Sequence, residues 1–257
     1  MEPYVKQHTK NGIGIIEFFH PAHNSLPANL LSELTRAITQ AGENESIKVI
    51  VLQSGGDRTF CAGASFEELV DIENEESGRE FFSGFANVIN AMRKCPKFII
   101  GRVQGKAIGG GVGLASATDY CMATKYAEIK LSELNLGIGP FVVGPAVQRK
   151  IGLNAMSQIA MDANSFYSAD WAMQKGLYTK VFDTVEGLDE AVTAFVEQLC
   201  EYNPKAMSEM KTMFWRGTED WDMLLAQRAK ISGRLVLSEF TKDKLRDFHH
   251  QSFEVSC

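Results

Sequence analysis

Two loops built from small residues are the parts of this sequence best suited to chemistry. Residues 60–66 read Phe-Cys-Ala-Gly-Ala-Ser-Phe, and residues 105–113 read Gly-Lys-Ala-Ile-Gly-Gly-Gly-Val-Gly. Small side chains let backbone N–H groups approach a ligand closely, and the second loop opens a predicted helix, whose N-terminus favours negative charge. One N–H group from each loop, directed at the same oxygen, would form an oxyanion hole.

Glycine-rich loops also have other interpretations. Tight turns and close helix–strand packing explain glycine runs equally well. A phosphate-binding P-loop is excluded because no Gly-Lys-Ser/Thr follows the glycines. Residues 111–116 nearly match a dinucleotide-binding fingerprint, but they begin eight residues beyond Val103 and end in Ser116. With Glu133 at the place of a ribose-binding acid, a dinucleotide site stays open as a minor alternative.

Glu133 is the third feature that could do chemistry. It lies in the largely apolar stretch of residues 130–141, which ends in a Gly-Pro turn. Burial of a carboxyl group raises its pKa toward the range useful for proton transfer. The alternative is a surface turn on which Glu133 forms a cap or an ion pair.

Other nucleophilic or metal-dependent sites are not favoured by the residue distribution. All five histidines lie near the chain ends, far from both loops in sequence, so a Ser-His-Asp or Cys-His site would need a terminus folded over the core. Cys61 lacks a base nearby in sequence and is interpreted as an inert buried thiol. No histidine and carboxylate pair has the spacing of metal ligands.

The elements that must position these loops alternate between strand and helix. Short apolar runs, typical of strands buried on both faces of a sheet, are separated by stripes of apolar residues at helical spacing. Strands are predicted at residues 13–19, 48–53, 98–103 and 119–123, and helices at residues 26–42, after the loop at 59–65, at about 79–94 and at 112–118. The pattern predicts an α/β fold with a sheet covered on both faces.

The chain becomes mostly helical beyond Gly152. Helices are predicted at residues 155–160, 168–175, 188–202, 204–215 and 220–237, with one strand at 179–182. Because no linker or low-complexity segment separates the two parts, independent domains are not supported.

The composition describes an ordinary globular chain. Among its 257 residues, 26 Lys and Arg stand against 32 Asp and Glu, a formal net charge of −6. This favours neither nucleic acid nor an anionic membrane surface as a partner, and no apolar run approaches the roughly 20 residues that span a bilayer. Five widely spaced cysteines without a CxxC motif indicate free thiols, and we expect a cytoplasmic protein.

Together these residues resemble the crotonase superfamily, the enoyl-CoA hydratases and isomerases. The resemblance is carried by residues 60–64, by the glycine triplet 109–111 leading to Thr118-Asp119, and by Glu133 with residues 136–138. It covers nearly the whole chain, including residues 24–26 and the helical C-terminal third.

The resemblance implies a spiral of ββα units with a C-terminal helical region that packs in homotrimers, often paired into hexamers. We expect residues 1–195 to form the core and residues 196–257 to form that helical region. The substrate would be an acyl-CoA thioester, with no cofactor or metal, since coenzyme A is part of the substrate. The thioester oxygen would be held by the N–H groups of Ala64 and Gly110. The other expected substrate contacts are Ala62, Phe66, Gly109, Ser132 and Phe141.

Several positions depart from the pattern of two-glutamate hydratases. Gly113 stands where those enzymes carry a second carboxylate, Ser132 where proline is frequent, Ser65 where aspartate is usual, and the bulky residues 141–143 where glycine-rich turns occur. Moving a double bond needs only one base, whereas hydration is served best by two carboxylates. We therefore favour isomerisation of an enoyl-CoA by Glu133 alone.

Two alternatives remain open. Hydration, including that of methylglutaconyl-CoA, would use Glu133 alone or with a second acid such as Glu67 or Glu68. A non-catalytic acyl-CoA-binding protein is the alternative of another class.

Overall fold

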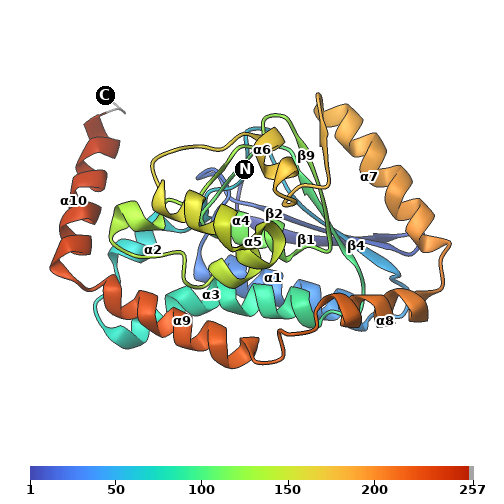
Figure 1. Ribbon diagram of the computed structural model, residues 1–257, viewed down its shortest axis with the longest axis horizontal. Coiled ribbons are helices and arrows are strands. Elements are labelled where there is room, and N and C mark those ends of the chain that lie inside the picture. The colour runs from blue at the N-terminus through green and yellow to red at the C-terminus, as the bar shows by residue number, and fades with distance from the viewer. Residues whose placement is uncertain (255–257) are drawn as a thin grey trace.

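A six-stranded sheet carries most of the core of the molecule (Figure 1). The computed structural model describes residues 1–254, with side chains to residue 247. Strands β1 and β2 pair antiparallel, and every other neighbouring pair in this sheet is parallel. In order across the sheet, the strands are β1 (Tyr4–Lys10), β2 (Ile13–Phe19), β4 (Val49–Ser54), β7 (Ile99–Val103), β9 (Tyr120–Thr124) and β11 (Lys180–Phe182).

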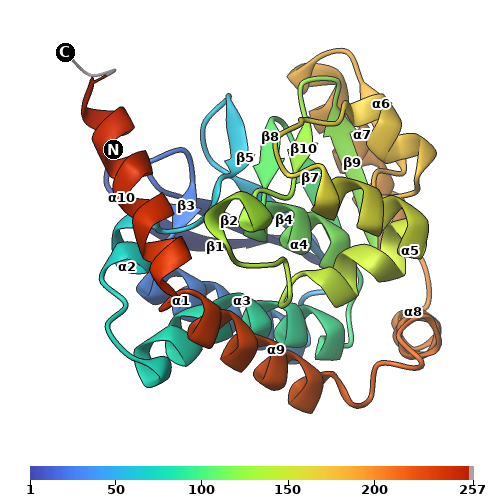
Figure 2. The same cartoon turned by 60° about the vertical axis from the view of Figure 1, so that its left-hand side comes forward.

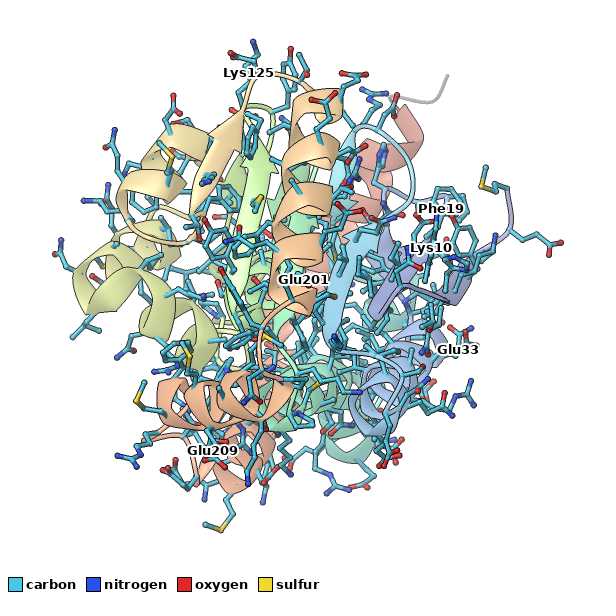
Figure 3. All side chains as sticks on the ribbon, turned by 90° about the vertical axis from the view of Figure 1, so that its right-hand side faces the viewer. Lys10, Phe19, Glu33, Lys125, Glu201 and Glu209 are labelled. Carbon is cyan, nitrogen blue, oxygen red and sulfur yellow. The ribbon has the colours of Figure 1, made fainter. Side chains whose placement is uncertain are left out.

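Helices cover both faces of this sheet, as predicted. Because side chains alternate between the faces of a strand, Ile50 and Leu52 of β4 pack with α1 (Ala28–Glu43) and α3 (Glu75–Lys94). Val49 and Val51 pack with α7 (Val185–Cys200) on the opposite face. Figure 3 looks onto the α7 side, with Lys10 and Phe19 on the hairpin at the sheet edge. Such double coverage explains why β4 is a continuous apolar run.

The edge strand β1 was not predicted, because its sequence is polar. Its residues 6–10 are exposed, and the strand is held by main-chain pairing with β2. The turn between them is Asn11-Gly12, with φ of 52° and 82°. Positive φ at both positions is typical of the two-residue turn that joins antiparallel strands.

Two small sheets lie beside the main one and hold the loops (Figure 2). One pairs β3 (Ser25–Leu26) with β6 (Gly63–Ala64), and the other contains β5 (Thr59–Cys61), β8 (Lys106–Ile108) and β10 (Ile129–Lys130). All of these pairings are parallel. The remaining elements near the loops are α2 (Phe66–Val70), α4 (Gly110–Ala117), the 3₁₀ turn η1 (Glu133–Leu136), α5 (Gly144–Met161) and α6 (Ala169–Gln174).

The C-terminal helices are α8 (Pro204–Phe214), α9 (Trp221–Leu235) and α10 (Glu239–Glu254). Helix α9 runs along α3, and the two cross where Gly78 meets Gly233. Helix α8 is fixed by Lys211, whose Nζ lies 2.8 Å from Oδ2 of Asp119; both side chains are buried. The boundary expected after residue 195 falls within α7, and the division into two parts stays a prediction.

Two helices are longer than the sequence patterns predicted. Helix α3 begins at Glu75, not near residue 79, because the Asn74 and Ser77 side chains form a reciprocal cap. Helix α5 begins at Gly144, not at residue 155, and is interrupted at Gly152, whose φ is 75°.

Cys61, Cys95, Cys121 and Cys200 are free and buried, whereas Cys257 lies outside the described residues. No helix within residues 1–254 has the length and apolar character that crossing a bilayer requires.

Candidate active site

The first loop is positioned by the segment that follows β2. The Asn24 side chain accepts a hydrogen bond from the His20 N–H and donates to the carbonyl oxygens of Gly55 and Thr59, each at 2.8 Å. The pairing of β3 with β6 then aligns residues 25–26 with residues 63–64. A chain segment far upstream therefore fixes the path of the loop.

The backbone on either side of Ala64 is tied to the segment at β3. Ala62 and Ser65 donate their N–H groups to the His23 and Leu26 carbonyl oxygens, each at 3.2 Å. These bonds hold Ala64 on the side of the loop that meets the second loop through Gly63. Gly63, at φ 95°, lies against that loop: a β-carbon here would be 3.2 Å from the Ile108 carbonyl oxygen and 3.5 Å from the Gly110 nitrogen.

The second loop places Gly110 at the first position of α4. An N–H group there has no partner within its own helix and lies at the positive end of the helix dipole. Gly109 adopts φ 52° and ψ −113°, a conformation that only glycine tolerates well. Its own N–H donates to the Lys130 carbonyl oxygen at 2.8 Å, which ties this loop to the strand before Glu133.

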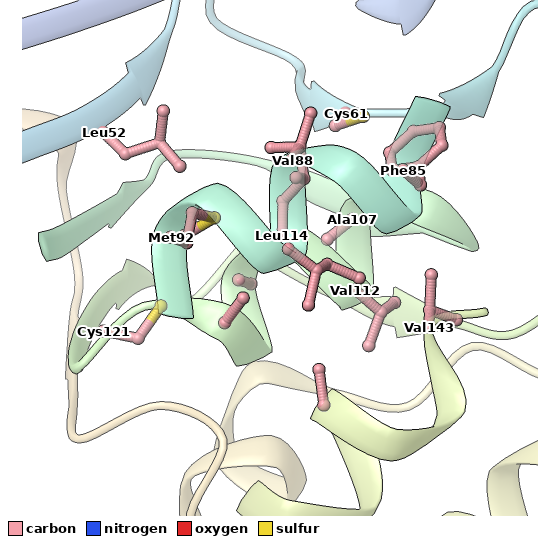
Figure 4. Packing of buried hydrophobic residues seen from close by; sticks show 14 of the residues in the cluster. Leu52, Cys61, Phe85, Val88, Met92, Ala107, Val112, Leu114, Cys121 and Val143 are labelled. Atoms are coloured by element: carbon pink, nitrogen blue, oxygen red, sulfur yellow. The ribbon is translucent and has the colours of Figure 1, made fainter. Parts of the chain in front are cut away.

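The start of α4 is packed too closely for side chains. A β-carbon at Gly110 would lie 2.3 Å from the Phe85 ring, and one at Gly111 would lie 2.3 Å from the Cys61 carbonyl oxygen. Figure 4 shows Phe85, Cys61 and Val143 around this helix. The two small-residue loops therefore meet in space, with the N–H groups of Ala64 and Gly110 at their junction.

Glu133 brings a buried carboxyl group to this junction. Its Oε1 would lie 3.0 Å from a β-carbon at Gly109, and its Oε2 is buried without a hydrogen-bond partner within the described part of the chain. Burial raises the pKa of Glu133 to about 7, partly offset by a hydrogen bond from its own backbone. A carboxyl group in this state can take up and release a proton near neutral pH.

The position of the missing second carboxylate is filled from another element. A β-carbon at Gly113 would lie 2.5 Å from Cγ1 and 2.8 Å from Cβ of Val143. A longer side chain at this position would need Val143 to move. Glu133 therefore faces the junction without a second acid from α4.

A cavity of about 800 Å³ opens between the loops and the helices α2, α3 and α9. The structure brings all eight predicted site residues to its wall: Ala62, Ala64, Phe66, Gly109, Gly110, Ser132, Glu133 and Phe141. Their individual roles stay predictions. The rest of the wall is largely apolar and includes Leu69, Phe81, Phe82, Phe85, Ile138, Val142 and Val143.

The profile of the enoyl-CoA hydratase/isomerase family matches residues 8–253. The chain belongs to this family. Its relatives include a peroxisomal Delta(3,5)-Delta(2,4)-dienoyl-CoA isomerase of Arabidopsis thaliana, 27% identical, which covers 84% of this chain and 81% of that protein. A short-chain-enoyl-CoA hydratase of Clostridium acetobutylicum is 28% identical over 88% of this chain and 87% of its own. The crystal structure of an enoyl-CoA hydratase from Bacillus halodurans is similar in fold, with a TM-score of 0.88 and 23% identity over 95% and 99% of the two chains.

The relatives of this enoyl-CoA hydratase/isomerase family member are crotonase superfamily enzymes. Its α/β architecture matches theirs. The predicted family and fold class are thereby confirmed. Whether the reaction is hydration or isomerisation is a finer question, because relatives of similar identity carry both names.

The sequence patterns missed part of the cavity wall. His20 and His23 lie far from both loops in sequence, yet they line the cavity because β3 runs beside β6. Asn24 was the available signal, since a buried asparagine that bridges three backbone groups is typical of a fixed loop. Ser232 of α9 was missed because nothing local links it to the loops.

The two carboxylates considered for a second catalytic acid differ in position. Glu68 accepts a hydrogen bond from the Ala28 N–H at the start of α1, at 2.8 Å. Glu67 is exposed at the edge of the cavity. Ser65, which replaces the usual aspartate, caps α2 by accepting the Glu68 N–H.

Proposed function

We propose that the protein isomerises a 3-enoyl-CoA to the conjugated 2-enoyl-CoA, with Glu133 as the only acid–base group. The observation that carries this proposal is the contact of Val143 with position 113. It leaves α4 without room for the second carboxylate that would help to position and activate water.

The reaction requires one proton to move between two carbon atoms. The Glu133 carboxylate removes a proton from C2, and the electron pair spreads over a dienolate whose oxygen accepts hydrogen bonds from the N–H groups of Ala64 and Gly110. The protonated Glu133 then returns the proton to C4, which leaves the double bond between C2 and C3. Each preorganised donor lowers such a barrier by about 3 kcal/mol.

The electrostatics of the site support this role. A base whose pKa is about 7 is both partly ionised and strong enough to act near neutral pH. The apolar wall formed by Phe141, Val142 and Val143 keeps water from the dienolate. The proton transfers use no cofactor or metal, and coenzyme A enters as part of the substrate.

Hydration is the second candidate because several relatives are named hydratases. They include a mitochondrial methylglutaconyl-CoA hydratase of Mus musculus, 29% identical over 73% of this chain and 60% of that protein. A substrate with a free carboxylate needs a cationic or strongly polar partner; among residues 1–247, the cavity wall has no Lys or Arg and offers His20 and His23 for that role. Of the two possible second acids, Glu68 is engaged at α1, and Glu67 lines the cavity at its exposed edge.

A non-catalytic acyl-CoA-binding protein is disfavoured by Glu133 itself. A buried, unpaired carboxyl oxygen is unfavourable for stability, and a protein that only binds has no use for it.

We further propose that the C-terminal helices assemble the chain into homotrimers or hexamers, as the family resemblance implies.

Incubation with a 3-enoyl-CoA and, separately, with a 2-enoyl-CoA tests the proposal through the absorbance of the conjugated thioester. We expect absorbance to appear with the first substrate and to fall with the second only as far as the equilibrium between the two isomers, because the enzyme catalyses both directions. Loss of absorbance from the 2-enoyl-CoA, without activity on the 3-enoyl-CoA, would establish hydration instead.

A further inference from the structure

Ser232 places a hydroxyl group in the wall of an otherwise apolar part of the cavity. The residue is 1% exposed and belongs to α9. It lines the cavity, where its hydroxyl is available to a ligand atom that can donate or accept a hydrogen bond.

The wall between α2, α3 and η1 is largely apolar. The neighbouring wall consists of apolar side chains from α2, from α3 and from the segment after η1, namely Leu69, Phe81, Phe82 and Ile138. Serines at helix interiors often bond to the carbonyl oxygen one turn back, as the Thr35 hydroxyl does toward the Leu31 carbonyl. No such bond ties down the Ser232 hydroxyl.

The place where α9 crosses α3 sets the distance between Ser232 and the reacting carbonyl. At one end of the cavity, the Phe85 ring touches Gly110 of the proposed oxyanion hole. Ser232 adjoins Gly233, which meets Gly78 where α9 crosses α3. The seven residues from Gly78 to Phe85 span about 10 Å of helix.

This distance corresponds to a medium-length acyl chain. Carbon–carbon bonds of about 1.5 Å in an extended zigzag advance about 1.25 Å each, so an extended chain covers 10 Å in about eight bonds. The aromatic rings of Phe81, Phe82 and Phe85 flank that path with apolar surface. The hydroxyl of Ser232 then lies near the end of the acyl chain.

We propose that Ser232 hydrogen-bonds an uncharged oxygen, a hydroxyl or keto group, near the far end of a medium-length acyl chain. A carboxylate there is disfavoured, because the described lining has no Lys or Arg and its two histidines, His20 and His23, lie on the segment before β3, beside the first loop. The inference rests on the proposed function, since it takes the thioester carbonyl to lie at Ala64 and Gly110.

Binding of saturated thioesters tests this without relying on turnover. Octanoyl-CoA, 8-hydroxyoctanoyl-CoA and 7-oxooctanoyl-CoA would be titrated calorimetrically into the protein and into Ser232→Ala. We expect the protein to bind at least one of the two oxygen-bearing thioesters about tenfold more tightly than octanoyl-CoA. Comparison of the hydroxyl and keto thioesters shows which oxygen is preferred. Ser232→Ala should bind all three chains alike.

Ser116→Ala is the matched control. Ser116 is also 1% exposed, but it lies outside the cavity wall, and its hydroxyl is buried without a partner in the described chain. This variant should keep the tenfold preference. Equal binding of all three chains by the unmodified protein, or a preference that survives in Ser232→Ala, would overturn the inference.

The same protein samples separate this inference from the proposed function. If 3-octenoyl-CoA is isomerised but no preference for oxygenated chains is found, only the role of Ser232 is wrong. If the preference is present but no 3-enoyl-CoA is isomerised, the proposed reaction is wrong and the binding role of Ser232 stands.

Discussion

Val143 occupies the space that any side chain at position 113 would need. Its Cγ1 lies 2.5 Å from where a β-carbon of residue 113 would be, well inside van der Waals contact. A side chain at position 113 and a bulky residue before α5 therefore exclude one another in this packing. An acid introduced at position 113 alone would not create a two-carboxylate site.

This contact predicts that substitutions at the two positions are coupled. Gly113→Ala should lower the free energy of unfolding by about 1–3 kcal/mol through overpacking. Val143→Ala should lower it too, by opening a cavity. The double variant should lose less than the sum of the two, as measured by urea denaturation; strictly additive losses would contradict the contact.

Glu133→Gln should abolish catalysis while substrate binding is kept. We expect kcat for a 3-enoyl-CoA to fall by about 10³-fold or more, because the amide cannot accept the C2 proton, while the Kd for a saturated acyl-CoA changes little. Glu209→Gln, an exposed substitution on α8 (Figure 3), is the matched control and should match the unmodified enzyme. Residual activity above a tenth would exclude Glu133 as the base.

The rate should depend on pH through the same carboxyl group. Because the pKa of Glu133 is raised to about 7 and the ionised form is the base, kcat/KM should fall tenfold per pH unit well below 7 and level off above it. A stopped assay between pH 5 and 9 measures this. A profile that is flat down to pH 5 would mean that the carboxyl group titrates near its ordinary value.

The stability of the enzyme should show the opposite pH dependence. The pKa of Glu133 is raised by burial from 4.5 in the unfolded chain to about 7, so the native state holds the proton over that interval. This stabilising contribution is present below pH 4.5 and is lost as the pH rises through 7. Relative to Glu133→Gln, the free energy of unfolding should therefore decline between pH 4.5 and 7. A constant difference would contradict the raised pKa.

The buried ion pair between Lys211 and Asp119 should hold α8 in place. Asp119 also accepts hydrogen bonds from the Ile99 N–H and the Trp215 indole. Asp119→Asn leaves Lys211 as a buried, uncompensated charge, and we expect it to lower the free energy of unfolding by about 3–5 kcal/mol. Asp189→Asn breaks the more exposed pair with Arg102 and should lower it by less than about 1 kcal/mol. Similar losses in the two variants would refute the structural role of the buried pair.

Much of the fold could be predicted because its long elements have clear patterns. The strand predicted at residues 13–19 has the bounds of β2, and those of β4 and β7 differ from prediction by one residue. The strands of two and three residues that hold the loops were not predicted, since segments so short show no periodicity. They form only because neighbouring backbone supplies their partners.

The site could be predicted in its residue types but not in its contacts. Glycine loops and an acid in an apolar stretch are visible in the sequence, and so are the missing carboxylate at Gly113 and the bulky residues 141–143. That Val143 fills the space beside Gly113 depends on how α5 packs on α4. The same is true of Ser232, which reaches the cavity only because α9 lies along α3.

The crowding around the start of α4 also limits how this enzyme can diversify. Gly110, Gly111 and Gly113 each lie against a different neighbour. A single substitution therefore cannot add a side chain at the start of α4 without displacing that neighbour. New substrate preferences would have to arise on the opposite wall, where α3 and α9 present replaceable side chains. We therefore expect side-chain replacements to be tolerated better on the wall formed by α3 and α9 than beside the two small-residue loops.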